Sequence, residues 1–445
     1  MKSKLDINLT RGLKPITNTF SHGMKFHLWT IGCQMNIADS ERMGSALTQL
    51  GLSPTNSAEE ADVIVLNSCV VRQSAEDKVT GQLTSMKPLK NSSARIIALM
   101  GCMVGPDTKL LKKKFPYVDV FMRPQEYDPL IELVGERIGI DPAGCIGQLL
   151  PAIDTTAYIP IIHGCDLFCS FCIIPYRRGR QVSKEIDEIA HEAQMLSQRG
   201  VKEITLLGQT VDAYGHDLEK QVDLSDLLYK LDGIDGLERI RFLTSHPQFM
   251  SERIIDAVAT LPKVCENINL PIQAGDDNIL KSMRRTYSID EYRNLIDRIR
   301  SKINHVSITT DIIVGFCGET KEQFQNTLKI VEEIQFDKVH IAAYSTREGT
   351  IAFRKQVDDV PLSEKKLRVK ELETLQQEIS TRINSKYLDS TEKVLIDGHE
   401  RGKWKGRTRT DKLVFVDSDE SDLNGKTKNV KITDTGPWSL KGIII

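Results

Sequence analysis

The sequence lacks long hydrophobic runs and has no excess of charge of either sign. Its apolar stretches, such as VIVL at 63–66, are far too short to span a bilayer. The N-terminal stretch MKSKLDINLTRGLKPITNTF has no apolar segment of a signal peptide, so we expect a cytoplasmic protein without a membrane anchor. The formal net charge of −2 excludes a general attraction for polyanions but leaves room for a local basic patch.

The patterns of disulfide-stabilised and zinc-binding proteins are also missing. Nine cysteines are an odd number in a long chain without a secretion signal, which favours reduced thiols or metal ligands. A structural zinc site normally takes four ligands, often as CxxC pairs, and the sequence has no second CxxC pair. No repeat of the solenoid type occurs either.

Strands and helices alternate in the first third of the chain. Strands are predicted at 25–32, 61–68 and 95–101, with helices between them at 36–51 and 74–87. This pattern predicts a parallel βαβ domain over 24–145, preceded by a leader at 1–23.

A second alternation follows over 151–383, which ends in a charge-rich helix at 362–384. Its strands are predicted at 158–163, 203–207, 239–244, 267–273, 306–314 and 338–344. Six such repeats predict a partial (βα)6 barrel of the TIM type. Short strands separated by Gly, Asp and Asn fill 384–445 and predict a small all-β barrel. The predicted fold class is therefore α/β with an all-β module at the C-terminus.

Three cysteines, Cys165, Cys169 and Cys172, lie in the loop after the first barrel strand with C-x3-C-x2-C spacing. Cysteine thiolates hold iron–sulfur clusters, and three ligands leave one iron of a cubane open. An open coordination position is the mark of a catalytic metal site, and chemistry in such barrels lies at the carboxyl ends of strands. We therefore predict a catalytic 4Fe–4S cluster here, with buried thiols or a zinc knuckle as the alternatives.

Three other cysteines, Cys33, Cys69 and Cys102, end the three strands of the N-terminal domain. Because the carboxyl ends of parallel strands share one edge of the sheet, these thiols are expected to converge. A single cysteine at such a place is commonly a small buried hydrophobe, whereas three at successive strand ends favour a shared function. The remaining cysteines, Cys145, Cys265 and Cys317, are expected to be structural.

The cysteine loop resembles that of the radical S-adenosylmethionine superfamily. Within that superfamily, GCQMNIADSERM (32–43), LNSCVVRQSAEDKV (66–79) and MGCMVG (100–105) are similar to cysteine segments of the methylthiotransferase family. GRTRTDKLV and ITDTGPWSLKG are similar to the RNA-binding TRAM module of the same family. The resemblance covers roughly residues 24–445, and the cysteines and all three domains agree in order.

This resemblance implies a radical enzyme with two 4Fe–4S clusters. S-adenosylmethionine would bind the open iron of the cluster on Cys165, Cys169 and Cys172, and its one-electron reduction would release a 5′-deoxyadenosyl radical. A second cluster, on Cys33, Cys69 and Cys102, would carry the sulfur to be inserted. The electron would come from a reductant such as flavodoxin or ferredoxin, two molecules of S-adenosylmethionine would be consumed, and a monomer is the default expectation.

The segment CVVR resembles the MiaB branch of the family, which makes 2-methylthio-N6-dimethylallyladenosine beside the anticodon of tRNA. The alternatives are threonylcarbamoyl-adenosine of tRNA or an aspartate of a ribosomal protein as the target. A rival of another class is a non-catalytic iron–sulfur protein that binds RNA.

Residues at the ends of the barrel strands are candidates for the pocket of S-adenosylmethionine or substrate. With Arg178 from the basic run YRRGR (176–180), they are Gly208, Gln209, Ser245, Gln273 and Asp311. His246 is either an acid or base or a structural hydrogen-bonding group. The arginines of the run are equally compatible with a solvated surface and with binding of a cofactor carboxylate or a phosphate.

A basic stretch with an aromatic residue, RGKWKGRTRTDK (401–412), lies in the predicted C-terminal barrel. Basic groups follow phosphates and aromatic rings stack on bases, so this stretch favours RNA binding over a solvated edge. The candidate residues are Lys403, Trp404, Lys405, Arg407, Arg409 and Trp438.

Overall fold

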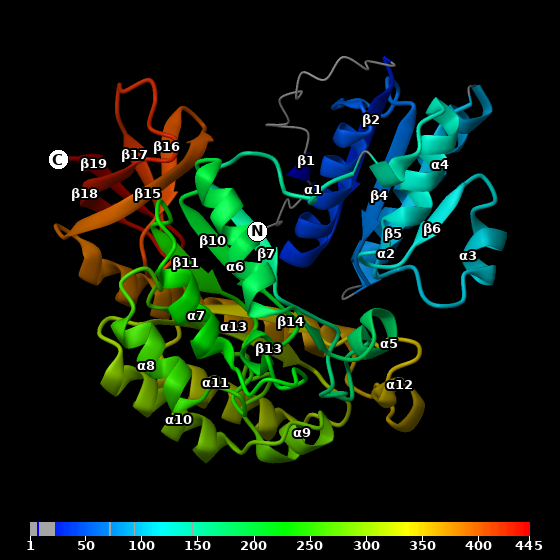
Figure 1. Ribbon diagram of the computed structural model, residues 1–445. Helices are drawn as coiled ribbons and strands as arrows, with labels where there is room; N and C mark the ends of the chain where they lie inside the picture. Colours follow the sequence, from blue (N-terminus) through cyan, green and yellow to red (C-terminus); the bar gives the residue numbers. More distant parts are fainter. Residues whose placement is uncertain (1–6, 9–22, 71–72, 93, 145) are drawn as a thin grey trace. The chain divides into compact units, whose positions relative to one another are not determined.

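The computed structural model describes residues 7–8, 23–70, 73–92, 94–144 and 146–445 (Figure 1). The chain divides into two compact units. The first contains Met1–Asp154, His163–Asp166 and Ile173–Gln181, and the second contains Thr155–Ile162, Leu167–Cys172 and Val182–Ile445. Most of the expected leader and Cys145 lie outside the described residues. The expected domain boundaries stay predictions.

The first unit is built on a mostly parallel sheet of the order β1-β2-β4-β5-β6, with β3 beside β2. Its strands are β1 (Ile7–Asn8), β2 (Lys25–Thr30), β3 (Ser53–Pro54), β4 (Val63–Ser68), β5 (Ile96–Gly101) and β6 (Val120–Met122). Its helices are α1 (Gln34–Gln49), α2 (Gln73–Ser92), α3 (Lys109–Lys114), α4 (Asp128–Ile138) and α5 (Ile174–Arg178), with a 3-10 turn at Pro142–Gly144.

The central strands β4 and β5 are buried at every position. Their continuous apolar runs are typical of parallel strands that are covered on both faces. Helices α1 and α4 pack on one face, which Val63 and Val65 of β4 also line. Helix α2 packs on the other face with Ile64 and Leu66. The predicted βαβ domain is therefore confirmed as a sheet between two helical layers (Figure 1).

The second unit begins with the six strands of the partial barrel. They are β7 (Thr156–Pro160), β10 (Glu203–Leu207), β11 (Arg239–Phe242), β12 (Asn267–Asn269), β13 (Ser307–Val314) and β14 (Lys338–Ala343). Two groups of three parallel strands, β11-β10-β7 and β12-β13-β14, meet at a parallel bridge between Ile240 and Val264. The predicted (βα)6 partial barrel is confirmed. Two short strands, β8 (Ile162–His163) and β9 (Val182–Ser183), follow β7 in the chain.

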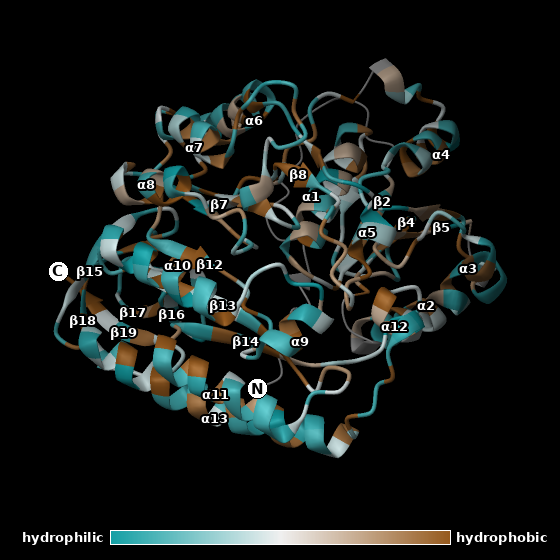
Figure 2. Cartoon of the chain, turned by 90° about the horizontal axis from the view of Figure 1, so that it is seen from below, coloured by the Kyte–Doolittle hydropathy of each residue, from teal (hydrophilic) through white to brown (hydrophobic). Residues whose placement is uncertain are grey.

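The helices of this unit follow the strands along the chain. They are α6 (Ile186–Gln198), α7 (Leu224–Asp232), α8 (Glu252–Thr260), α9 (Asp277–Ser282), α10 (Ile289–Lys302), α11 (Lys321–Ile334), α12 (Ile351–Lys355) and α13 (Leu362–Asn384), with 3-10 turns at Val211–Ala213 and Ser385–Tyr387. Helix α10 is typical of most of these helices. Ser288 caps its first turn, and its apolar residues at helical spacing are buried. Its outer side is mostly hydrophilic (Figure 2). None of the helices in the described ranges is long and apolar enough to cross a membrane.

The last five strands form the closed barrel β15-β16-β17-β19-β18, as the sequence predicts. They are β15 (Thr391–Glu400), β16 (Lys403–Arg407), β17 (Leu413–Asp417), β18 (Thr427–Thr435) and β19 (Leu440–Ile444). Alternate residues such as Val394 and Ile396, Val414 and Val416 point inward and make its core.

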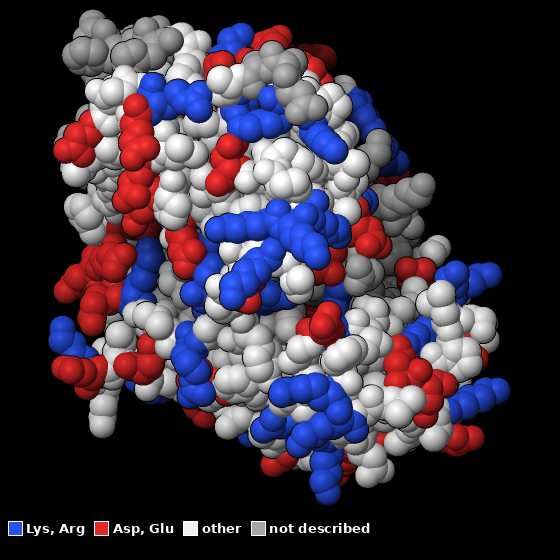
Figure 3. Space-filling view, turned by 90° about the vertical axis from the view of Figure 1, so that its right-hand side faces the viewer, with Lys and Arg blue, Asp and Glu red and all other residues white. Residues whose placement is uncertain are grey.

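Basic side chains are unevenly distributed over the surface. Figure 3 shows Lys and Arg gathered in clusters on one face, although the net charge of the chain is only −2. In the first unit, α3 alone carries four exposed lysines: Lys109, Lys112, Lys113 and Lys114. Local basic patches therefore exist on a nearly neutral chain.

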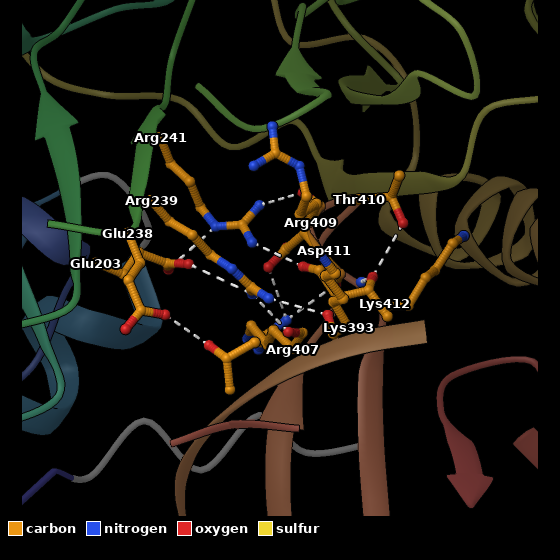
Figure 4. Close-up of polar contacts among 12 residues, drawn as sticks. Glu203, Glu238, Arg239, Arg241, Lys393, Arg407, Arg409, Thr410, Asp411 and Lys412 are labelled. Carbon is orange, nitrogen blue, oxygen red and sulfur yellow. Dashed lines mark hydrogen bonds and ion pairs between the residues drawn. The ribbon is translucent and has the colours of Figure 1, made fainter. Parts of the chain in front are cut away.

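Two buried arginines of β11 join the partial barrel to the C-terminal barrel (Figure 4). Arg241 donates to the carbonyls of Arg409 and Thr408, at 2.7 Å each, and lies 3.0 Å from the Glu203 carboxylate. Arg239 donates to the carbonyls of Arg407 and Lys393 at 2.7 and 2.9 Å. These carbonyls belong to the end of β16, to the loop after it and to β15, so the two arginines give buried backbone acceptors of the C-terminal barrel charged donors.

Replacing Arg241 by methionine is expected to destabilise the C-terminal barrel by about 3 kcal/mol, because two carbonyls and Glu203 lose a buried partner. Two of the three tryptophans, Trp404 and Trp438, report on this barrel, so urea unfolding followed by fluorescence measures the effect. The matched control is Arg253→Met, which breaks an exposed ion pair and should cost less than about 1 kcal/mol. Equal losses in the two variants would contradict a clamp at Arg241.

Candidate active site

Cys33, Cys69 and Cys102 lie at the carboxyl ends of three neighbouring parallel strands, β2, β4 and β5. A Cβ at Gly32 would lie 2.9 Å from the Cβ of Cys69, so the first two cysteine segments approach closely. Burial raises the pKa of the Cys102 thiol above its usual value. The charge of Arg178 lowers this pKa, and the charge of the Cys33 thiolate raises it. The structure thus brings the three thiols to one edge of the sheet.

Backbone and amide hydrogen bonds fix this edge. Asn36 donates to Asn67 Oδ1 and to the Ser68 carbonyl, at 3.0 Å each, and so ties the start of α1 to the end of β4. Cys102 donates its N–H to the Ser68 carbonyl at 2.9 Å. Gly101 has a φ of +97°, and a Cβ there would lie 2.5 Å from that same carbonyl, so the turn before Cys102 requires glycine.

The arginines of the run 176–180 have different surroundings within the first unit. Arg178 is buried against Cys102 and Asp39. Arg177 lies over Gly105, where a Cβ would come within 2.3 Å of its Nη1. Arg180 is 72% exposed in its side chain and pairs with Asp166 at 2.9 Å. Of the three arginines, only Arg180 has the surroundings of a solvated charge, whereas Arg178 contacts Cys102 and Asp39.

Two buried hydrogen-bond donors at this edge are suited to bind an electron-rich group that is not part of the polypeptide. Within the described residues, Arg178 Nη1 and Arg177 Nε are buried without a hydrogen-bond partner. Buried polar groups are almost always satisfied, so such donors need an explanation. The described residues contain no group of three or more His, Cys, Asp or Glu arranged around a single metal ion. A cubane needs a different arrangement, because each thiolate binds its own iron.

The loop of Cys165, Cys169 and Cys172 follows β7 and is held by its backbone. Cys165 donates its N–H to the Gly179 carbonyl at 3.2 Å, and Cys172 donates to the Cys169 carbonyl at 3.0 Å. Ser170 donates to the carbonyls of Met283 and Ser282, through its N–H at 3.0 Å and its hydroxyl at 2.8 Å. The loop is therefore fixed on both sides of its middle cysteine.

Arg285 is a residue of this loop's surroundings that the sequence analysis missed. Its Nη1 lies 3.6 Å from Cys169 Sγ, and its guanidinium lies 5.9 and 5.8 Å from the ring centres of Phe171 and Tyr287. The run MRRTY marks two arginines, and only the structure shows that Arg284 is exposed while Arg285 turns inward. A guanidinium in this position, beside Cys169, can bind an anionic group.

The candidate pocket residues of the second unit fall at the strand ends. Ser245 follows β11 and donates its N–H to the Asn269 carbonyl at 3.1 Å, while its buried Oγ has no partner in the described part of the chain. Gln273 takes a φ of +71° and donates its N–H to the Asp311 carbonyl at 2.9 Å. Asp311 accepts from Asn269 Nδ2 at 3.1 Å, which makes Asn269 a second residue that the sequence analysis missed. Gly208 and Gln209 directly follow β10.

His246 and Asp212 form a buried pair between neighbouring strand ends. Both carboxylate oxygens of Asp212 accept the backbone N–H of His246, at 2.8 and 3.0 Å. The imidazole Nδ1 of His246 accepts the backbone N–H of Gln248 at 3.2 Å. Burial and the Arg285 charge lower the pKa of His246 to about 3, so the imidazole is neutral at physiological pH. These contacts favour the structural interpretation of His246 over the acid or base.

Burial raises the pKa of Asp212 from 3.8 to about 8, against the hydrogen bonds that lower it. Between these two values the folded chain keeps a proton that the unfolded chain releases, so the free energy of unfolding falls as the pH rises through this window. Asp212→Asn removes this titration. As the pH increases through the window, the free energy of unfolding of the variant should therefore rise relative to that of the wild type, by up to about 1.4 kcal/mol per pH unit. Urea unfolding of both proteins at pH 5 and 8 measures this, and parallel pH dependences would refute it.

The candidate RNA-binding residues have acidic or backbone partners. Lys403, Lys405 and Arg407 pair with Asp417, Glu400 and Asp411 at 2.9, 3.4 and 3.0 Å on the surface. Such exposed pairs are weak, so phosphates can replace the carboxylates. Trp404 donates its indole N–H to the Glu420 carbonyl at 3.0 Å, and Trp438 is 44% exposed.

Arg409 differs from the other basic residues of this stretch. Its guanidinium binds the Glu266 carboxylate at 2.7 Å and the carbonyls of Pro262 and Val264 at 2.8 and 2.6 Å. Figure 4 shows it beside Arg241 at the join between the two barrels. Binding of a phosphate by Arg409 would require the loss of these contacts.

Three family models match the chain in the order that the sequence predicts. The uncharacterized protein family UPF0004 matches residues 25–123, the radical SAM superfamily matches 159–331 and the TRAM domain matches 385–445. Together with the partial barrel and the cysteine loop, they define a radical S-adenosylmethionine enzyme with a TRAM module. The superfamily implies a 4Fe–4S cluster and S-adenosylmethionine as cofactors.

Curated relatives extend over nearly the whole chain. The tRNA-2-methylthio-N(6)-dimethylallyladenosine synthase of Herpetosiphon aurantiacus is 48% identical over 433 residues, which cover 95% of this chain and 97% of the relative. That of Roseiflexus sp. is 47% identical over 428 residues, with 94% and 89% covered. The chain belongs to the family of tRNA-2-methylthio-N(6)-dimethylallyladenosine synthases, as the resemblance of its motifs predicts.

Solved structures show likeness of fold alone. The radical S-adenosylmethionine methyltransferase TsrM from Kitasatospora setae, solved with cobalamin and a 4Fe–4S cluster, has a TM-score of 0.53. It is 12% identical, and the match covers 73% of this chain and 75% of that one.

Proposed function

We propose that the protein attaches a methylthio group to C2 of N6-dimethylallyladenosine next to the anticodon of tRNA. The single observation that carries this proposal is the position of Cys33, Cys69 and Cys102 at the ends of three neighbouring strands, in a chain that matches the radical S-adenosylmethionine superfamily. Radical chemistry alone requires only the first set of three thiols, whereas insertion of sulfur requires a second cluster and therefore a second set. The C–H bond at C2 has no acidic proton for a general base, which is why a radical is required.

In this proposal Cys165, Cys169 and Cys172 hold one 4Fe–4S cluster by a thiolate each. S-adenosylmethionine bound there supplies a 5′-deoxyadenosyl radical. Arg285, beside Cys169, and the Ser245 hydroxyl, which has no partner among the described residues, are donors for its polar groups. Gln273, after β12, is bonded to the Asp311 carbonyl of β13, and Asn269 binds the Asp311 carboxylate, so both residues offer polar atoms at defined positions for cofactor or substrate.

Cys33, Cys69 and Cys102 hold a second 4Fe–4S cluster in the first unit. Asn36, Ser68 and Gly101 hold the strand-end turns that carry these cysteines, which supports a preorganised site. Cys33 is the exposed member of the set, whereas Cys69 and Cys102 are buried. The cluster site is therefore open on the side of Cys33.

The tRNA is bound by the TRAM barrel and by other basic surfaces. Lys403, Lys405 and Arg407 exchange their surface carboxylates for phosphates, while Trp404 and Trp438 offer rings to bases. Flavodoxin or ferredoxin supplies the electron, and the reaction takes place in the cytoplasm on a monomeric enzyme.

Nucleoside analysis of tRNA tests the proposal. A strain without this gene should lack 2-methylthio-N6-dimethylallyladenosine and accumulate N6-dimethylallyladenosine, and the wild-type gene should restore the mark. Loss of a methylthio mark on threonylcarbamoyl-adenosine, or on a ribosomal protein, would instead identify one of the other branches. An unchanged nucleoside profile with normal RNA binding would favour a non-catalytic protein.

A further inference from the structure

One buried ion pair in the first unit has no role in the reaction described above. Arg178 and Asp39 lie 3.2 Å apart, between Nη2 and Oδ2, with 2% and 0% of their side chains exposed. Burying two charges costs free energy that a surface pair does not cost. A buried ion pair therefore need not stabilise the fold, and a functional role of the Arg178 charge has to be considered.

The arginine of this pair faces a cysteine sulfur. Its Nε donates to Cys102 Sγ at 3.3 Å, and its Nη1 is buried without a partner in the described residues. On the other side, Tyr127 donates its hydroxyl to Asp39 Oδ1 at 3.4 Å. The order Tyr127, Asp39, Arg178, Cys102 is thus a hydrogen-bonded chain that ends on a thiol.

The backbone that carries Arg178 is fixed by hydrogen bonds on its C-terminal side. Arg178 is the last residue of α5, and Gly179 follows it with a φ of +82°. The Gly179 carbonyl accepts the Cys165 N–H at 3.2 Å, and its own N–H donates to the Pro175 carbonyl at 3.1 Å. The backbone next to Arg178 is therefore held in place, while Cys102 and Asp39 hold the guanidinium itself.

We infer that Arg178 is a positioning residue for the second cluster, which it orients and whose reduction potential it raises through an N–H···S bond to Cys102. This inference rests on the proposed function, because it requires a cluster on Cys33, Cys69 and Cys102. Residues that hydrogen-bond to metal ligands orient them and tune the metal. For iron–sulfur clusters, hydrogen bonds to sulfur and nearby charge set the potential.

The direction follows from electrostatics. Reduction adds a negative charge to the cluster, and a donor N–H on a ligand sulfur stabilises that charge. Asp39 opposes the effect because its carboxylate lies behind the guanidinium. The burial of both groups leaves the dipole of the pair, positive end on Cys102, little screened by water. Arg178 and Asp39 should therefore shift the potential in opposite directions.

The test uses the full-length chain with Cys165, Cys169 and Cys172 all replaced by alanine, so that only the second cluster remains. After anaerobic reconstitution, iron content and potentiometric titration with electron paramagnetic resonance give occupancy and midpoint potential. Added to this parent, Arg178→Gln should shift the potential to more negative values, and Asp39→Asn should shift it to more positive values. Arg178→Lys, which keeps the charge without the fork geometry, should shift it less than Arg178→Gln.

The matched control is Arg180→Gln, which removes an exposed arginine from the same run and should leave the potential unchanged. A parent that binds no iron would refute the second cluster of the proposed function. If the parent binds a cluster and neither Arg178→Gln nor Asp39→Asn changes its potential, the inference is refuted while the proposed function stands. If Arg178→Gln loses its cluster, Arg178→Lys and Asp39→Asn decide, and shifts of the same sign in both would overturn the inference.

Discussion

Replacing Cys169 by alanine is expected to abolish formation of 5′-deoxyadenosine completely. Cys169 is buried, is one of the three cysteines of its loop and touches Arg285. Two remaining thiols would leave two irons of the cubane without protein ligands, so the cluster would be lost. Anaerobic incubation with dithionite and S-adenosylmethionine, followed by chromatography, measures the product.

Cys317→Ala is the matched control for this prediction. Cys317 is as buried as Cys169, at 8% exposure each, and also follows a barrel strand at its carboxyl end. It belongs to neither set of three, so this variant should keep both the cluster and the cleavage. Formation of 5′-deoxyadenosine by Cys169→Ala, or its loss in Cys317→Ala, would contradict the assignment of the loop.

Joint replacement of Cys33, Cys69 and Cys102 by alanine should have a different result. Cleavage of S-adenosylmethionine should continue, because Cys165, Cys169 and Cys172 are intact, while methylthiolation of tRNA should disappear. The iron content should fall by about half, since one of two cubanes is lost.

The measurement compares 5′-deoxyadenosine with modified nucleoside in one reaction. A variant that still makes the methylthio product at the wild-type rate would show that these thiols do not carry sulfur. A variant that loses cleavage as well would show that the first unit is required for the radical step itself, and the folding of the variant would then be checked by its secondary structure.

Much of the fold could be predicted because the signals are local. The buried runs VIVLNS and IIALMG mark central parallel strands, and the C-x3-C-x2-C spacing needs only one loop. Strand β12 is shorter than predicted, Asn267–Asn269 instead of 267–273. Pro271 has no N–H for a ladder, and Gln273 has a φ of +71°, which a strand does not allow.

The partners of the arginines could not be predicted from the sequence. Arg178 stands in a basic run, and its partner Asp39 is 139 residues away. Arg409 lies in a stretch typical of RNA binding, yet its guanidinium is engaged by Glu266, 143 residues away. Composition shows that charges are present, but burial decides whether a charge meets solvent, RNA or a carboxylate.

The pairing of Arg178 with Asp39 also limits how this chain can be divided. A fragment that ends at Asp154 contains Asp39 but not Arg178, because Ile173–Gln181 returns to the first unit from within the barrel sequence. The Asp39 carboxylate would lose its buried ion-pair partner and keep the Tyr127 hydroxyl, at a cost of about 3–5 kcal/mol. The N-terminal unit is therefore not a module that can be cut out or exchanged between proteins as one continuous piece of sequence.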